Sequence, residues 1–259
     1  MHGNRVIIFF LLIFFSISSH NLLGAQNAFL PGEQLEYKAY YHLGFLWIPA
    51  ASIKLSVLPN ENAKYITLQA IGQSFKRYDP FFKVRENYIS TVNAKTLAPV
   101  LATRKATEGS YQVDDRAVFN QDSGMIDYHI IRNSGGNSIG KEKIKGSCFD
   151  ILTAAYYFRT FNFSGMNIGE RFVINTFTDG KIYPISIQYI GNEMCTDNED
   201  RSYSCSKFRV STIKGKVFSG KDDILIWVTN DAARIPIRAT SKILVGEVNV
   251  VLTSATGVR

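Results

Sequence analysis

Few side chains in this sequence could carry out covalent chemistry, and Cys148 is the first of them. The pattern around Cys148 predicts a helix that begins there, and a helix N-terminus lowers the pKa of a thiol. A thiolate nucleophile also needs a base, and His42 and His129 are the only histidines beyond residue 25. His129 falls in a strand-like run, where a structural role is expected. Burial explains Cys148 equally well, so it stands as a weak catalytic candidate.

Paired carboxylates are the second possibility, because two acids about 5 to 9.5 Å apart hydrolyse glycosides. Asp231 and Glu86 are the acids that we would inspect. Asp231 also fits an Asx turn that Arg234 locks and Pro236 ends, which makes it a weak candidate. The sequence has no HExxH or paired-cysteine zinc motif and no glycine-rich phosphate loop. We therefore expect no metal and no cofactor.

Aromatic residues make up 13% of the chain and favour binding over catalysis. Aromatic faces stack on sugar rings and line lipid cavities, although most aromatic side chains in an all-β domain fill the core. Trp47 is the best exception, because it lies with Phe45 in the loop sequence GFLWIP, where a large apolar side chain is expected at an interface or ligand. Tyr41, Tyr78 and Arg234 complete the candidate ligand-binding residues.

The elements that must position these residues are short strands. Alternating apolar and polar residues, as in 52–57, predict half-buried antiparallel strands. Asp179-Gly180 separates two such runs and predicts a type I′ hairpin. Gly246 and residues 219–223 mark two more turns. Ten or more strands at this spacing predict an all-β fold, either an antiparallel β-barrel or a strongly curved sheet.

One segment departs from the strand pattern. Ser147 and Asp150 have capping-box spacing, and apolar residues follow at helical spacing over 151–158. The sequence therefore predicts one amphipathic helix near 148–161, about three turns long, that plugs or caps the barrel. Residues 132–146 are rich in glycine, serine, asparagine and lysine and are expected to form a mobile loop.

The N-terminus predicts export. Arg5 precedes the apolar run 6–15, which is too short to span a bilayer, and a serine-rich segment leads to the small residue Ala25. This order is typical of a secretory signal peptide over residues 1–25, followed by a single domain over 26–259. No later apolar run approaches 18 residues, so the processed chain is not expected to span a membrane.

The charge of the processed chain is positive. Residues 26–259 hold 28 basic and 22 acidic side chains, a net charge of +6. A positive charge favours an anionic partner such as an envelope polymer or a lipid headgroup. A need for solubility accounts for the same charge equally well. The basic residues are scattered rather than clustered, so a nucleic-acid partner is not expected.

Three cysteines remain in the processed chain. Cys195 and Cys205 flank the polar sequence CTDNEDRSYSC, and two neighbouring strands joined by this loop would bring their Cα atoms within disulfide range. Because an exported protein can be oxidised, we predict a Cys195–Cys205 disulfide that contributes about 2–3 kcal/mol. Cys148 then has no obvious partner.

Two stretches carry a family pattern. Residues 31–57 contain a G-E-x-L-x-Y strand followed by a hairpin, and residues 227–257 contain an aromatic-V-T-x-D-x-x-R-x-P step and a closing glycine hairpin. The segments FDILTAAYYFR and YSCSKFRV lie between them in the expected order. Over roughly residues 30–257 the chain resembles the bacterial exported proteins grouped as domain of unknown function family 3108. This resemblance implies a β-barrel-like fold, at the periplasm or surface of a Gram-negative bacterium, and no catalytic residues; the excursion 195–205 is not part of its pattern.

These observations lead to one main functional hypothesis and two alternatives. The first is non-catalytic binding of a glycan or lipid-like ligand of the cell envelope, in a large cavity lined by aromatic side chains. The second is an envelope hydrolase or transferase that uses carboxylates or Cys148. The third is a scaffold protein that binds another envelope component through exposed loops such as 45–49.

Overall fold

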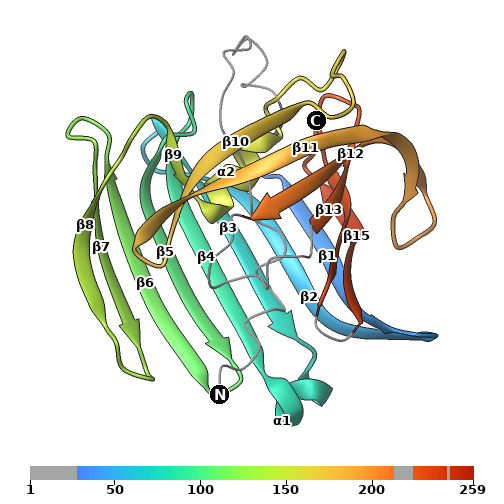
Figure 1. Ribbon diagram of the computed structural model, residues 1–259, viewed down its shortest axis with the longest axis horizontal. Coiled ribbons are helices and arrows are strands. Elements are labelled where there is room, and N and C mark those ends of the chain that lie inside the picture. Colours follow the sequence, from blue (N-terminus) through green and yellow to red (C-terminus); the bar gives the residue numbers. More distant parts are fainter. Residues whose placement is uncertain (1–27, 213–223, 244–245) are drawn as a thin grey trace.

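A computed structural model describes residues 28–212, 224–243 and 246–259 of the chain (Figure 1). The predicted signal peptide and the predicted turn at 219–223 lie outside these residues. Fifteen strands of the described chain form one sheet, in the order β8-β7-β6-β5-β4-β3-β2-β1-β15-β14-β13-β12-β11-β10-β9. The all-β prediction is therefore confirmed, and the strand number exceeds the expected minimum of ten.

The strands of the first half of the sheet are β1 Gln34–Leu43, β2 Leu46–Pro59, β3 Tyr65–Ser74, β4 Val84–Asn93, β5 Pro99–Glu108, β6 Tyr111–Asn120, β7 Met125–Arg132 and β8 Ser138–Lys143. The second half holds β9 Cys148–Asp150, β10 Arg171–Thr178, β11 Lys181–Thr196, β12 Ser202–Thr212, β13 Ile224–Thr229, β14 Pro236–Lys242 and β15 Glu247–Thr256. The short helices are η3 Lys76–Tyr78, α1 Asp79–Phe82 and α2 Ile151–Phe158. No helix among these is long and apolar enough to cross a membrane.

The sheet is an open, strongly curved meander. Consecutive strands pair from β1 to β8 and from β9 to β15, and β1 also pairs with β15, from Gln34 opposite Thr256 to His42 opposite Glu247. Every pair is antiparallel except β9 with β10. The edge strands β8 and β9 do not pair with each other, so the strongly curved sheet is observed and a closed barrel is not.

The second half of the sheet folds over the inner face of the first half. Figure 1 shows the β10–β11 hairpin crossing the strands β5 to β7. Phe177 of β10 packs with Phe119 and Ile126 of β6 and β7 in one buried cluster. At the hairpin tip, the Arg132 guanidinium lies 3.4 Å from the Asp179 carboxylate. The interior is therefore closed by packing of side chains rather than by backbone pairing.

Helix α2 lies inside this fold and begins later than predicted. Asp150, not Ser147, is its N-cap, because the Asp150 carboxylate accepts hydrogen bonds from the backbone N–H groups of Leu152 and Thr153 at 3.0 and 3.1 Å. Cys148 to Asp150 instead join the sheet as β9, parallel to β10. The helix has only eight residues, and all but Ala155 are buried. It is a core element rather than an amphipathic cap.

The aromatic side chains around α2 pack against one another. Phe158 of the helix contacts Phe163 and Phe208 with ring centroids 4.9 and 5.0 Å apart, and Phe172 lies 6.2 Å from both Phe158 and Phe208. Offset and edge-to-face rings at these separations are the geometry of a packed core. The rings expected to line a ligand cavity thus fill the interior here.

Two turn predictions are confirmed, and one loop prediction is wrong. Asp179 and Gly180 both have positive φ, +50° and +79°, as a type I′ hairpin requires. Gly246, with φ +84°, lies in the β14–β15 turn. The segment 132–146 is not one long loop, because β8 pairs with β7 within it. Polar residues suit this strand because it lies at the sheet edge.

Candidate functional site

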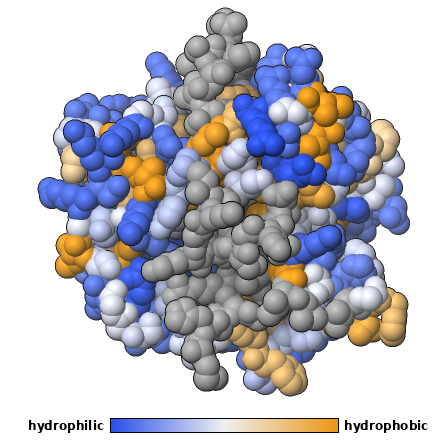
Figure 2. All heavy atoms as spheres, in the orientation of Figure 1, coloured by the Kyte–Doolittle hydropathy of each residue, from blue (hydrophilic) through white to orange (hydrophobic). Residues whose placement is uncertain are grey.

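Large apolar side chains are exposed at one end of the molecule. Phe45, Leu46 and Trp47 at the β1–β2 turn are 90%, 46% and 55% exposed, and Phe81 of α1 is 86% exposed. We call these four residues the apolar rim. Figure 1 places the β1–β2 hairpin and α1 at the lower end of the sheet, and Figure 2 shows hydrophobic atoms protruding at two separate places along that edge. Exposed apolar side chains at one end of a molecule indicate a contact surface.

The hairpin tip is held in a defined conformation. Leu43 pairs with Leu46 across a two-residue loop, and Gly44 has φ +59°, which suits the first central position of a type II′ turn. His42 contacts the Gly44 carbonyl oxygen through Nε2 at 2.8 Å. The Trp47 ring stacks on the His42 ring with centroids 4.4 Å apart. The backbone and this ring pair together support the exposed aromatic tip.

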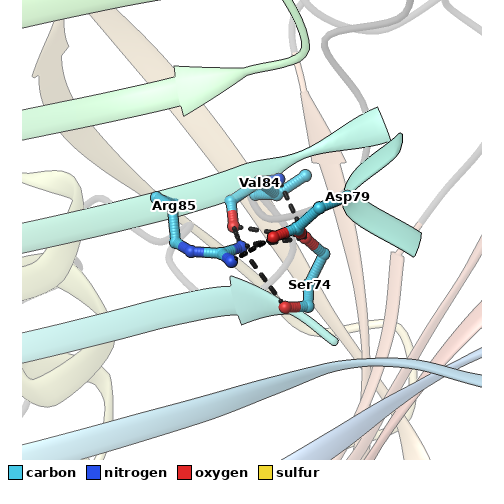
Figure 3. Close-up of polar contacts among 4 residues, drawn as sticks. All are labelled: Ser74, Asp79, Val84 and Arg85. Atoms are coloured by element: carbon cyan, nitrogen blue, oxygen red, sulfur yellow. Dashed lines mark hydrogen bonds and ion pairs between the residues drawn. The ribbon is translucent and has the colours of Figure 1, made fainter. Parts of the chain in front are cut away.

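Helix α1 is fixed by a polar cluster that Figure 3 shows at close range. The Ser74 hydroxyl donates to Asp79 at 2.7 Å and accepts from the Val84 N–H at 3.0 Å. The Arg85 guanidinium donates to both carboxylate oxygens of Asp79, at 3.1 and 2.5 Å. These hydrogen bonds from Arg85 and Ser74 lower the pKa of Asp79. Because Asp79 is tied to both flanking strands, Phe81 of the same short helix is held in its exposed position.

The two parts of the rim are connected to each other. The Arg77 guanidinium donates to the Pro49 carbonyl oxygen at 3.2 Å and stacks on the Tyr78 ring at 4.8 Å. Lys76, Arg77 and Lys83 flank Phe81, are exposed, and form no ion pair with any described residue. The rim therefore combines apolar side chains with unpaired positive charge.

The predicted ligand-binding residues separate into two groups. Phe45 and Trp47 belong to the rim, and Tyr78 lies beside it on η3. Tyr41 is half-buried on β1, against the β14–β15 turn at Gly246. Arg234 lies in the β13–β14 turn and donates to the Arg159 carbonyl oxygen at 3.3 Å. Arg234 is thus a contact of the segment after α2 and is not part of the rim.

Phe81 and Leu46 belong to the rim but were absent from the predicted set. Phe81 lies in the sequence DPFF, and the four-residue helix that this sequence forms buries none of its residues. Leu46 lies in the GFLWIP segment already noted for Trp47. The alternation of the strand starting there places Leu46 and Trp47 on opposite faces of the hairpin, so both are exposed at its tip.

The structure contradicts the predicted setting of Cys148. The residue lies on β9 and not at a helix N-terminus, and its side chain is 3% exposed. Burial is the main cause that raises the pKa of the thiol to about 12, and the Asp150 charge adds to it. Neither candidate base is beside it, because His42 stacks on Trp47 and His129 is exposed on β7. The thiol is therefore protonated at neutral pH.

The candidate carboxylates have structural partners. The Asp231 carboxylate accepts from the Thr229 hydroxyl at 2.7 Å and from the N–H groups of Ala233 and Arg234 at 3.1 and 3.0 Å. This is the expected Asx turn, closed by the backbone of Arg234. Glu86 lies on the inner face of β4, so the two acids belong to different parts of the fold.

Glu86 belongs to a buried network on the inner face of β4 to β6. The Arg104 guanidinium lies 3.4 Å from Glu86, 2.8 Å from Glu108 and over the Tyr88 ring. Burial raises the pKa of Glu86 to about 7, although the positive charge of Arg104 opposes the shift. On β6, burial and then the Asp179 charge raise the pKa of Asp115 to about 6. Glu86 is buried beside Arg104 and Glu108, and one carboxylate oxygen of Asp115 is buried without a hydrogen-bond partner among the described residues.

A depression of about 640 Å³ lies on the outer face of β3 to β7. Polar side chains such as Gln73, Asn87 and Gln112 line it, and Lys105 pairs with Asp114 there at 3.2 Å. None of its lining residues is aromatic. This depression does not match the aromatic-lined cavity that the sequence predicted, and the exposed rim remains the best candidate for a binding site.

Comparisons with known proteins agree with this architecture. The family described as "Protein of unknown function (DUF3108)" matches residues 36–253. The crystal structure of a β-barrel-like protein of domain of unknown function DUF1849 from Brucella abortus is similar in fold, with a TM-score of 0.55 and 7% sequence identity. The similarity covers 86% of this chain and 96% of that chain. No curated protein matches the sequence. At this identity the likeness concerns the fold alone.

Proposed function

We propose that this chain, which belongs to the DUF3108 family, is a non-catalytic protein of the cell envelope that binds a lipid-like or glycan ligand at its apolar rim. The observation that carries the proposal is the exposure of Phe45, Trp47 and Phe81 on rigid supports at one end of the sheet. Burying one such side chain in an apolar environment is worth about 1.5–3 kcal/mol. Burial of these exposed side chains against an apolar ligand would therefore be strongly favourable.

Binding is favoured over catalysis because the reactive groups are occupied. The Cys148 thiol is buried with a raised pKa, and the Asp231 carboxylate caps a turn. Glu86 is buried against Arg104. A hydrolase or transferase based on these residues would first need a structural change that exposes them. The enzyme hypothesis is therefore the weaker alternative.

A scaffold role is the second candidate function, because the exposed turn 44–47 could contact a protein partner. The aliphatic and aromatic character of the rim favours a lipid-like ligand over a glycan, since sugars also need directed hydrogen bonds. The flanking Lys76 and Lys83 favour a ligand with negative charge.

The proposal is tested by binding of the purified protein to two probes. These are vesicles of phosphatidylcholine and phosphatidylglycerol in equal parts, and soluble oligomers of N-acetylglucosamine. The double variant Phe45→Ser, Trp47→Ala should lose binding to whichever probe the protein binds. Ile139→Ser is the matched control, because Ile139 is an apolar residue of β8, 79% exposed and outside the rim. Lack of binding to both probes, or equal binding by the double variant, would contradict the proposal.

We further propose export to the periplasm or surface of a Gram-negative bacterium, with oxidation of Cys195 and Cys205. All three cysteines are free thiols in the structure. Cys195 and Cys205 lie on the adjacent strands β11 and β12 but are offset by two residues, because Cys195 is opposite Tyr203 and Cys205 is opposite Glu193. The two thiols are therefore near each other but not at disulfide distance, and the proposed bond requires a local shift of these strands. The neighbouring Cys205 thiol lowers the pKa of Cys195. A disulfide donor in the periplasm would take two electrons and two protons from this pair, and its own disulfide would become two thiols.

Counting thiols tests both export and oxidation. Protein isolated from the periplasmic fraction and unfolded in denaturant should react at Cys148 alone. The same chain made without residues 1–25 in a reducing cytoplasm should react at all three cysteines. Three reactive thiols in the periplasmic protein would disprove the disulfide, and absence of the protein from that fraction would disprove export.

A further inference from the structure

We infer that the apolar rim docks on the surface of an anionic lipid bilayer, with Phe45, Trp47 and Phe81 inserted among the lipids and Lys76, Arg77 and Lys83 at the headgroups. This inference rests on the proposed function and names the ligand class. Each step below depends on a different observation.

The shape of the rim excludes a ligand that needs a pocket. Phe45 and Phe81 are 90% and 86% exposed, so neither ring lies in a pocket formed by neighbouring residues. They project from two separate elements, the β1–β2 hairpin and α1, at the same end of the molecule (Figure 1). A ligand that contacts both must therefore bring its own extended apolar surface, as a bilayer does.

The charge around the rim identifies the kind of bilayer. Between residues 76 and 85 the chain carries four basic residues and one acid, Asp79. Arg85 neutralises Asp79 through two hydrogen bonds, which leaves Lys76, Arg77 and Lys83 exposed and unpaired among the described residues. Basic side chains beside inserted apolar residues are the pattern by which peripheral proteins select anionic lipid surfaces.

The residue types suit the depth at which each would lie. Trp47 has an amphipathic ring, and tryptophan is enriched at the boundary between headgroups and acyl chains. Its stacking on His42 holds the ring in place before binding. The Arg77 bond to Pro49 and the Asp79 cluster fix the hairpin and α1 relative to the same strands. Little conformational entropy would therefore be lost on docking.

The two tryptophans of the chain provide a direct measurement. Trp47 is 55% exposed, whereas Trp227 is 7% exposed and its indole N–H donates to Glu193. Vesicles of phosphatidylcholine and phosphatidylglycerol in equal parts, with brominated acyl chains, should quench Trp47 and shift its emission to shorter wavelength. Vesicles of phosphatidylcholine alone should not, and added salt should reverse the binding. The variant Trp47→Phe gives the background from Trp227.

Substitutions separate the apolar from the charged contribution. Phe81→Ser should weaken binding to the anionic vesicles about tenfold, since one inserted ring is lost. Lys76→Ala and Lys83→Ala should each weaken it about fivefold. Ile139→Ser and Lys95→Ala are matched controls outside the rim and should bind as the unchanged protein does. Lys95 is exposed in the β4–β5 loop, at the opposite end of these strands.

The possible outcomes distinguish this inference from the proposed function. Equal binding to neutral and anionic vesicles would contradict the preference for anionic lipid but not the proposed lipid binding. Binding that the lysine variants leave unchanged would have the same meaning. Binding of the N-acetylglucosamine oligomers alone would contradict docking on a bilayer but would keep the rim as the binding site. Sedimentation that shows a dimer lost in Phe45→Ser, with no vesicle binding, would assign the rim to a second copy of the chain. Failure of every probe would overturn both proposals.

Discussion

Cys148 illustrates how the environment of one residue decides its chemistry. The thiol lies among Phe119, Ile126 and Phe177, where a thiolate would lose its hydration without gaining a positive partner. We predict that iodoacetamide does not label Cys148 in the folded protein at neutral pH but labels it fully in denaturant. Mass spectrometry of the alkylated peptide provides the measurement. Stoichiometric labelling of the folded protein, lost on replacing His129 or His42, would instead support the nucleophile hypothesis.

Asp115 predicts a pH dependence of stability. Its pKa is raised from 3.8 to about 6 in the folded protein by burial and by the Asp179 charge, with Arg104 and Arg132 opposing. One carboxylate oxygen is buried and has no hydrogen-bond partner among the described residues. Between these two pKa values the folded state binds a proton that the unfolded state has released. The free energy of unfolding therefore falls as the pH rises through this window.

The variant Asp115→Asn removes this contribution. Each unit of pKa corresponds to about 1.4 kcal/mol, so the variant should exceed the unchanged protein in stability by on the order of 2 to 3 kcal/mol at about pH 8. At about pH 4 the two proteins should be nearly equal, because the acid is protonated in the folded state. Urea denaturation at both pH values is the measurement. A constant difference between the proteins would contradict the raised pKa.

At the scale of single residues, the sequence predicted correctly those features that depend on neighbouring residues in the chain. The Asx turn at Asp231 and the exposure of Phe45 and Trp47 depend on neighbours in the chain, and all three were predicted. Burial of Cys148 against Phe119 and Phe177 depends on residues about thirty positions away on either side, which the local pattern does not contain. The exposure of Phe81 was not predicted, because the sequence DPFF does not distinguish Phe81 from its neighbour Phe82.

At the scale of elements, α2 is anchored at its end by a buried ion pair. The Arg159 guanidinium, just after the helix, contacts both carboxylate oxygens of Glu33 at 2.6 and 2.7 Å and donates to the Ala233 carbonyl oxygen. Both side chains are almost fully buried. This network ties the helix to the start of β1 and to the β13–β14 turn.

Removing one partner of this pair should be costly. Glu33→Ala should lower the free energy of unfolding by about 3–5 kcal/mol, because the Arg159 charge remains buried without its carboxylate. The double variant Glu33→Ala, Arg159→Met should be less destabilised than Glu33→Ala alone. Guanidinium denaturation of the three proteins measures the difference. A double variant less stable than Glu33→Ala would contradict this expectation.

The boundary of α2 and the edge strand β8 were not predicted correctly from the sequence pattern. Asp150 was recognised as part of a helix cap, but the boundary shifted because Cys148 to Asp150 gain backbone pairing with β10. A strand of three residues leaves no periodic signal. The edge strand β8 was missed because its sequence, SIGKEK, lacks the apolar alternation that marks a strand packed on a core.

At the scale of the whole molecule, the all-β class followed from many short alternating runs, whereas the closure of the interior did not. The β10–β11 hairpin reaches β7, where a Cβ on Gly180 would lie 3.0 Å from the Tyr128 ring. Such a contact joins residues about fifty positions apart and depends on the curvature of the sheet. The consequence for function is that aromatic residues fill the inside, and the exposed ones gather at one end.

Amide hydrogen exchange tests this central claim, that binding occurs at the apolar rim and not inside the curved sheet. The purified protein is compared with and without phosphatidylcholine–phosphatidylglycerol vesicles. The account predicts added protection confined to segments 43–48 and 76–83, with the strands β4 to β7 and α2 unchanged. Added protection around α2 or on the inner strands, with the two rim segments unchanged, would contradict it.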